Sequence, residues 1–245
     1  MMKFLSYPIT IVFFVFFGLT LVIFHPIQWA AHNVFGDNAQ KRIVSILNWF
    51  LMRCTNILGS RYQFDNPHTI PTNRPLIIVT NHQSMYDISP IIWYMRKHHP
   101  KFVAKKELGK GIPSVSYNLR HGGSALIDRK DGRQAIAEIG KLGGYIEKHN
   151  RAAVIFPEGT RSRTGKPKPF KPMGLKMLMK RAPSALIVPI TINNSWKLLR
   201  FGQFPMGLGA YLKFKVHKPL ENKGNADELI SKVEQVIVND IIPVK

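Results

Sequence analysis

Cysteine is almost absent from this chain of 245 residues, which contains only Cys54. One cysteine cannot form an internal disulfide or supply a zinc cluster of cysteine ligands. Cys54 lies in an apolar stretch with helical spacing, so we expect a packed and unreactive thiol. The sequence therefore excludes a disulfide framework as the source of its stability.

Two catalytic patterns are also missing. The chain has no Gly-x-Ser-x-Gly nucleophile elbow, which argues against a Ser-His-Asp hydrolase built on Ser84. It has no His-Glu-x-x-His motif either, and we interpret the adjacent pair His98 and His99 as surface histidines. No metal site is expected.

Acidic residues are scarce: 14 Asp and Glu stand against 35 Lys and Arg, which gives a formal net charge of +21. Such a balance predicts anionic partners, namely lipid headgroups, phosphorylated substrates, an acidic carrier protein or nucleic acid. Charge alone does not choose among them. The length suits one ordinary domain with a short attachment.

Charged residues are missing from Leu5 to Phe24, a run of mostly apolar residues long enough to cross a bilayer as a helix. Pro8, Gly18 and Pro26 interrupt the run, and a second apolar stretch follows from Ile43 to Leu58. A hairpin lying partly in one leaflet is therefore an alternative to a membrane span.

We expect residues 1–60 to anchor the protein to a membrane and residues 61–245 to form the catalytic domain. The anticipated location is the cytoplasmic membrane, with the active site on its cytoplasmic side. The run is too long for the core of a simple signal peptide, and no small-x-small cleavage site follows it.

Short apolar runs with the composition of strands recur at residues 61–64, 76–79, 102–104, 125–127, 153–156, 185–192 and 212–216. Helical spacing of apolar residues appears at 136–146 and 229–237, and Asn225 is a suitable N-cap for the second segment. This alternation predicts an α/β sheet covered by helices.

Polar residues follow several of these strands. Because ligands collect at the carboxyl ends of strands in open α/β sheets, these positions are the first candidates for a site. They are Asn81, His82 and Asp87 after the run 76–79, Lys105 after 102–104, Arg129 after 125–127, and Glu158, Gly159, Thr160 and Arg161 after 153–156.

His82 and Asp87 have the chemistry of a general base with its partner. A histidine can remove the proton from an attacking hydroxyl near neutral pH, and a carboxylate five residues on can orient the ring and stabilise its charged form. The alternative is that His82 caps a helix and Asp87 is a solvated acid in its first turn.

The cations Lys105, Arg129 and Arg161 could surround a phosphate monoester, although each taken singly also fits a solvated surface residue. Gly159 permits close approach of the backbone. Glu158 could bind a substrate hydroxyl or orient Arg161, and a purely structural turn is the alternative.

Two segments resemble the signature blocks of the 1-acylglycerol-3-phosphate acyltransferase family: Asn-His-Gln-Ser-Met-Tyr-Asp at 81–87 and Phe-Pro-Glu-Gly-Thr-Arg-Ser at 156–162. Weaker blocks at 105–108, 123–129 and 188–190 agree, so that the resemblance covers residues 76–192. It implies a mixed, mostly parallel sheet flanked by helices, as in glycerol-3-phosphate acyltransferases.

The resemblance also implies an activity. A fatty-acyl group would pass from acyl carrier protein or acyl-CoA to the sn-2 hydroxyl of lysophosphatidic acid, giving phosphatidic acid. His82 would be the general base, Asp87 its partner, and the binding residues Asn81, Lys105, Arg129, Glu158, Gly159, Thr160 and Arg161. The family implies no metal, no other cofactor and no covalent acyl-enzyme.

The expected partners are the lipid acceptor, the acyl thioester and an anionic membrane surface, and nucleic acid is not expected. Two alternatives remain open. The acceptor could be glycerol-3-phosphate, another lysophospholipid or an acylated amino lipid. The chain could instead be a non-enzymatic basic protein that binds membranes or nucleic acid through charge.

Overall fold

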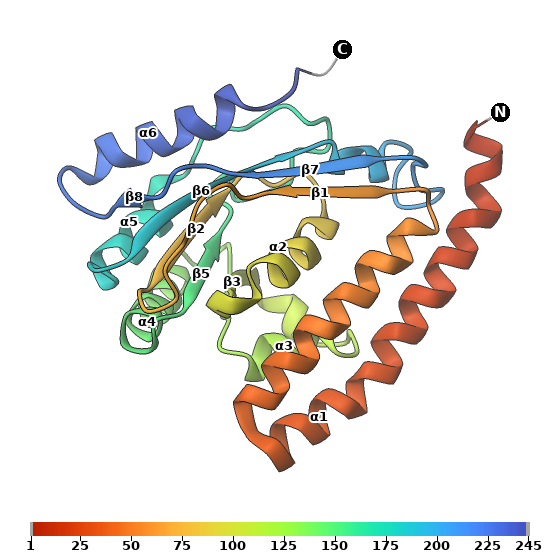
Figure 1. Cartoon of the computed structure of the whole chain (residues 1–245), viewed down its shortest axis with the longest axis horizontal. Coiled ribbons are helices and arrows are strands. Elements are labelled where there is room, and N and C mark those ends of the chain that lie inside the picture. The colour runs from red at the N-terminus through yellow and green to blue at the C-terminus, as the bar shows by residue number, and fades with distance from the viewer. Residues whose placement is uncertain (1, 244–245) are drawn as a thin grey trace.

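The computed structural model describes residues 2–243 (Figure 1). The strands are β1 (Arg61–Asp65), β2 (Leu76–Thr80), β3 (Lys101–Lys105), β4 (Ala125–Ile127), β5 (Ala152–Ile155), β6 (Leu186–Asn193), β7 (Tyr211–Val216) and β8 (Leu220–Glu221). The helices are α1 (Met2–Asn56), α2 (Ile88–Tyr94), α3 (Val115–His121), α4 (Gly132–His149), α5 (Pro172–Arg181) and α6 (Ala226–Asn239). Short 3₁₀ turns are η1 (Met85–Asp87), η2 (Arg96–His98), η3 (Lys106–Gly109) and η4 (Ser195–Leu199).

The strands form one mixed sheet in the order β1-β7-β6-β2-β5-β3-β4, with β8 beside β6. β6, β2, β5, β3 and β4 are parallel neighbours, whereas β7 and β8 run antiparallel to β6, and β1 is parallel to β7. The predicted α/β class, with a mostly parallel sheet, is confirmed.

β2 lies near the middle of the sheet and shows how the two layers of helices are held. Every residue from Leu76 to Thr80 is buried, because helices cover both faces of the sheet. Leu76 and Ile78 belong to a core shared with α1 and α2, and Ile77 and Val79 to a core shared with α4, α5 and α6. Figure 1 shows the same two layers.

α1 consists of two helical limbs joined at Gly36, which has a φ of 77° that glycine adopts without strain. The limbs lie side by side (Figure 1), and Leu21 on the first packs with Leu47 and Leu51 on the second. Cys54 is buried and its sulfur lies 3.5 Å from the Thr20 hydroxyl, which confirms the packed thiol.

The position of the break corrects one expectation. The helix continues through Pro8, Gly18 and Pro26, and the chain reverses at Gly36 instead. The result is a hairpin whose first limb is long and apolar enough to cross a membrane by length and composition. Only 17% of its most apolar 18-residue window is buried within the protein.

The reading of His98 and His99 as surface residues is wrong for His98, which is buried with 8% of its surface exposed. His99 is half-buried and borders a pocket. The pair lies where η2 leads into β3, and the chain enters the sheet there through His99 with a positive φ of 50°.

Candidate active site

The turn after β2 is built by side chains that bind its own backbone. Asn81 is buried, and its amide donates to the carbonyl of Ile192 at 2.8 Å and accepts from the N–H of the same residue at 2.7 Å. This pair of bonds extends the contact with β6 beyond the last residue of β2. Ser84 then caps η1, with its hydroxyl accepting from Tyr86 N at 3.1 Å.

Within this turn, the Nδ1 atom of His82 lies 2.9 Å from Oδ2 of Asp87. Asp87 is fully buried, and the same oxygen accepts the backbone N–H groups of Gln83 at 2.8 Å and Ser84 at 2.9 Å. A buried carboxylate needs such donors to offset the loss of water. The bond to Asp87 directs the proton of the neutral ring to Nδ1 and leaves Nε2 as the acceptor.

Nε2 of His82 has no hydrogen-bond partner among the residues that the structure describes. The side chain is 13% exposed, so the ring is shielded on most sides and still reachable. A buried acid behind the ring and an unoccupied nitrogen in front form the arrangement that a general base requires.

Phe156 holds the ring from one side. Its phenyl ring stacks on the imidazole with centroids 4.0 Å apart and planes 26° apart, and it stacks in turn with Phe102. The strand register explains the contact. Val79 on β2 pairs with Ile155 on β5, so the residues that follow the two strands leave the sheet side by side. A flat apolar contact of this kind restricts rotation of the imidazole.

Glu158 ties the loop after β5 to the His82 turn. One carboxylate oxygen accepts the backbone N–H of His82 at 3.0 Å and the other accepts that of Lys168 at 3.2 Å. Ser162 N also donates to the His82 carbonyl at 2.7 Å. Burial raises the pKa of Glu158 to about 7, and the two backbone donors act in the opposite direction.

Arg161 is a cation of this loop whose charge acts on the His82 turn. It is half-buried, and its charge lowers the pKa of Tyr86, which burial raises. Gly159 adopts a φ of +70° at the turn, next to the side chain of Lys171, and Thr160 is exposed. The turn therefore combines a buried acid, Glu158, with a half-buried cation, Arg161.

Lys105 and Arg129 lie at the same edge of the sheet but further away. Lys105 ends β3 and Arg129 follows β4. These are the second and third strands from β2, so they lie about 10 and 14 Å from β2 at the usual spacing of strands. Lys105 pairs with Glu107 at 3.0 Å, and both cations are exposed. No contact joins either of them to His82 or Asp87 within residues 2–243.

No separate role was predicted for Phe156 or Gln83, although both lie in the segments that resemble the family's signature blocks. Phe156 directly follows Ile155, the partner of Val79, and this register between β2 and β5 is seen only in the structure. Gln83 is buried, and its Oε1 accepts Ser195 N at 3.1 Å, which connects the His82 turn to η4. A contact across 112 residues leaves no local pattern in the sequence.

The profile of the acyltransferase family matches residues 61–193, which is more than half of the chain. The chain belongs to this family. Its matched segment contains the His82 turn and the loop of Glu158 and Arg161.

Among the described residues, no group of three or more His, Cys, Asp or Glu side chains could hold a metal ion.

Individual proteins agree with the family. A 1-acyl-sn-glycerol-3-phosphate acyltransferase of Helicobacter pylori is 41% identical over 128 residues, which are 49% of this chain and 51% of that protein. The human beta form is 30% identical over 128 residues, covering 52% and 45% of the two chains. The chain thus spans about half the length of these curated relatives.

A solved structure shows the same fold. It is the 1-acyl-sn-glycerophosphate (LPA) acyltransferase PlsC of Thermotoga maritima, with a TM-score of 0.79 and 24% sequence identity. The likeness covers 98% of this chain and 96% of that one, so it includes the N-terminal helical hairpin as well as the sheet.

The raised pKa of Glu158 predicts a pH dependence of stability. A folded-state pKa of about 7 lies above the ordinary value of 4.5, so the folded state holds this proton more tightly than the unfolded chain does. The resulting stabilisation is complete below the ordinary value and is lost as the pH rises through about 7. The melting temperature of the wild-type protein should therefore fall by a few degrees relative to Glu158→Gln between about pH 5 and pH 8.

Thermal unfolding followed by circular dichroism measures this difference. Glu228→Gln removes an exposed carboxylate on α6 and serves as the control, whose melting curve should follow that of the wild type at each pH. Parallel pH profiles for the wild type and Glu158→Gln would show that Glu158 does not titrate in this range.

Proposed function

We propose that the protein transfers a fatty-acyl group from acyl carrier protein or acyl-CoA to the sn-2 hydroxyl of 1-acylglycerol-3-phosphate, giving phosphatidic acid. The observation that carries the proposal is the contact of 2.9 Å between His82 and Asp87, which leaves Nε2 free at the carboxyl end of β2. Membership of the acyltransferase family and the activity for which the relatives are named support the same reaction.

In the proposed reaction, Nε2 of His82 accepts the proton of the acceptor hydroxyl as its oxygen attacks the carbonyl carbon of the acyl thioester. Asp87 stabilises the imidazolium that forms. The tetrahedral intermediate then collapses, the carbon–sulfur bond breaks, and the leaving thiolate recovers the proton from Nε2. The acyl group goes directly from sulfur to oxygen, with no acyl-enzyme and with no cofactor beyond the acyl thioester.

The acceptor's phosphate would meet the cations at this edge of the sheet. The charge of Arg161 acts on Tyr86 in the His82 turn, and Lys105 and Arg129 would add charge further out. Gly159 and Thr160 would form the turn that the substrate approaches.

Asn81 and Glu158 would contribute to substrate binding by another route. The polar atoms of both side chains contact the backbone: those of Asn81 bind Ile192, and those of Glu158 bind His82 and Lys168. Their part in the proposal is to fix the two loops between which the acceptor lies.

Residues 1–60 would anchor the enzyme, and residues 61–245 would carry the chemistry. The first limb of α1 exposes large apolar side chains: Phe4, Ile11, Val15, Phe16, Leu19, Val22 and Ile23 are each more than half exposed. Phe13 and Phe17 of the same limb contact the ring of Tyr86, which lies between His82 and Asp87 in the sequence. A lipid acceptor could then reach the site without leaving the membrane, on the cytoplasmic side of the cytoplasmic membrane.

His82→Ala should reduce acyl transfer by a factor of about 10² to 10⁴, because the hydroxyl would lose its base. The assay measures thiol release from acyl-CoA in the presence of lysophosphatidic acid. His149→Ala removes an exposed ring at the end of α4 and should retain full activity. A His82→Ala protein that folds and keeps the wild-type rate would refute the base.

Arg161→Gln should raise the KM for lysophosphatidic acid by about 10- to 100-fold, since a hydrogen bond to a charged group contributes about 1.5–3 kcal/mol. Arg163→Gln, an exposed cation two residues along the same loop, is the matched control and should change the KM little. A monoacylglycerol lacking the phosphate should be used equally poorly by the wild type and by Arg161→Gln. Equal KM values for the two arginine variants would argue against phosphate recognition by Arg161.

Replacing both Phe16 and Ile23 by lysine should reduce binding to phospholipid vesicles by more than tenfold, because lysine costs about 2.5–3.5 kcal/mol at the centre of a membrane helix. Phe16 and Ile23 are 53% and 56% exposed, so the fold should be unaffected in detergent. Ile242→Lys, at an exposed position beyond α6, is the control. Vesicle flotation compares them, and unchanged flotation of the double variant would contradict the anchor.

A further inference from the structure

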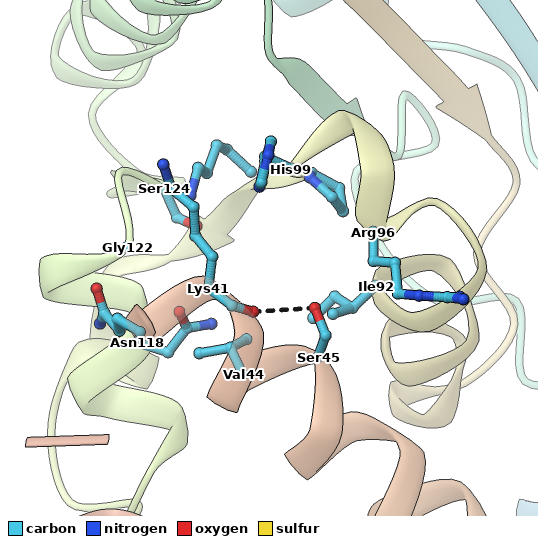
Figure 2. Close-up of a pocket in the computed structure, with 12 residues that line it drawn as sticks. Lys41, Val44, Ser45, Ile92, Arg96, His99, Asn118, Gly122 and Ser124 are labelled. Carbon is cyan, nitrogen blue, oxygen red and sulfur yellow. Dashed lines mark hydrogen bonds between the residues drawn. The ribbon is translucent and has the colours of Figure 1, made fainter. Parts of the chain in front are cut away.

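A polar pocket lies at the opposite end of β3 from the candidate active site. The second limb of α1, the η2–β3 connection and the region from α3 to β4 surround it (Figure 2). Gln40, Lys41, His99, Lys101 and Asn118 are among its lining residues. Its cavity volume of about 30 Å³ is two to three times the roughly 10–15 Å³ that one ordered water needs.

Lys101 is the most buried charged residue among those that line this pocket. Only 6% of its surface is exposed, and no hydrogen bond or ion pair to its ammonium group is found within residues 2–243. Burial, together with the positive charges of Lys41 and Arg151, lowers the pKa of Lys101 to about 8. A buried ammonium without a partner is costly, so that a lysine is rarely found in this state.

The other basic groups act on the same space. The pKa of His99 is lowered to about 4 by burial and then by the charges of Arg151, Lys41 and Lys101. His99 is therefore a neutral ring at physiological pH and can donate one N–H. Arg96 also borders the pocket, but its guanidinium donates to the Trp93 carbonyl at 2.7 Å and stacks on the Trp93 ring.

Acceptors for these donors are scarce. Asp37 is the one carboxylate found to raise the pKa of Lys101 among the described residues, and it is 70% exposed and paired with His32 at 3.4 Å. Gln40 is buried, and its side-chain NH₂ group has no hydrogen-bond partner among the described residues. The Nε atom of Arg151 is also buried without a hydrogen-bond partner there. The pocket thus gathers an ammonium group, an amide donor and further positive charge around a space with no matching anion.

We propose that this pocket binds the phosphate group of an anionic ligand between α1 and the amino end of β3. A phosphate group combines a negative charge with several acceptor oxygens, which Lys101, Gln40 and His99 can contact together. The cavity suits a group of that size and is too small for an acyl chain. Two sources share this chemistry: free inorganic phosphate and the phosphodiester of an anionic lipid headgroup.

The pocket is separate from the site proposed for acyl transfer. Lys101 and Lys105 are the first and last residues of β3, which places them about 13 Å apart at the usual rise of a strand. The inference does not depend on the proposed function, and its test needs no measurement of activity.

The test uses the full chain in detergent and follows thermal unfolding with low-millimolar inorganic phosphate at constant ionic strength. Phosphate at about ten times its Kd should raise the melting temperature of the wild type by roughly 3–6 °C. Lys101→Met should melt at a higher temperature than the wild type without phosphate, because the unpaired charge is gone, and should lose the response to phosphate.

Two further variants separate the pocket from general charge effects. Gln40→Leu keeps the net charge and removes one donor, so it should weaken the response, and it also tests the proposal if Lys101→Met does not fold. Lys232→Met removes an exposed lysine on α6 and should respond as the wild type does.

A lipid arm distinguishes the two sources. The same proteins are placed in nanodiscs of phosphatidylglycerol or phosphatidylcholine and their melting temperatures are compared. Stabilisation of the wild type over Lys101→Met by phosphatidylglycerol but not by inorganic phosphate assigns the pocket to a lipid headgroup, and the reverse assigns it to the free anion. If neither ligand changes the difference between wild type and Lys101→Met, the pocket binds no phosphate and the proposal is wrong.

Discussion

The burial of the Asp87 carboxylate is the constraint on which the candidate site depends. A fully buried carboxylate is stable only if donors replace its water, and here two backbone N–H groups and the His82 ring do so. The backbone donors come from Gln83 and Ser84, within the turn that carries the histidine. The imidazole is therefore held by the same bonds that allow the acid to be buried.

On the neighbouring loop, the buried carboxylate of Glu158 is likewise stabilised by backbone N–H groups. Its two oxygens accept N–H groups from His82 and Lys168, so a second buried acid joins the loop after β5 to the turn after β2. The two acids also affect each other, because the charge of Asp87 adds to the burial that raises the pKa of Glu158. The site thus gains rigidity, and the proximity of two negative groups in a buried region is the corresponding cost.

Much of this arrangement could be predicted from local patterns. The apolar runs located the strands of the sheet, and Asn225 does cap α6, with its side chain accepting from Asp227 N at 2.8 Å. The prolines suggested the wrong position for the break in the N-terminal segment. A helix that faces lipid or a neighbouring limb tolerates Pro8 and Pro26, whereas the reversal of the chain needs the positive φ of Gly36. The antiparallel placement of β7, the stacking of Phe156 and the burial of His98 depend on contacts far apart in the sequence, which leave no periodic signal.

The excess of basic over acidic residues is reflected in how few acids are available to pair with the cations of the two sites. The sequence has only 14 acidic residues, and the two acids of the candidate site already satisfy backbone donors. They are therefore not available to pair with cations such as Arg161. At the other end of β3, Lys101 is likewise without an acidic partner among the described residues. Because no ion pair to an internal acid is found for Arg161 or Lys101 among the described residues, both cations are open to anionic ligands, which is what the net charge of +21 predicts.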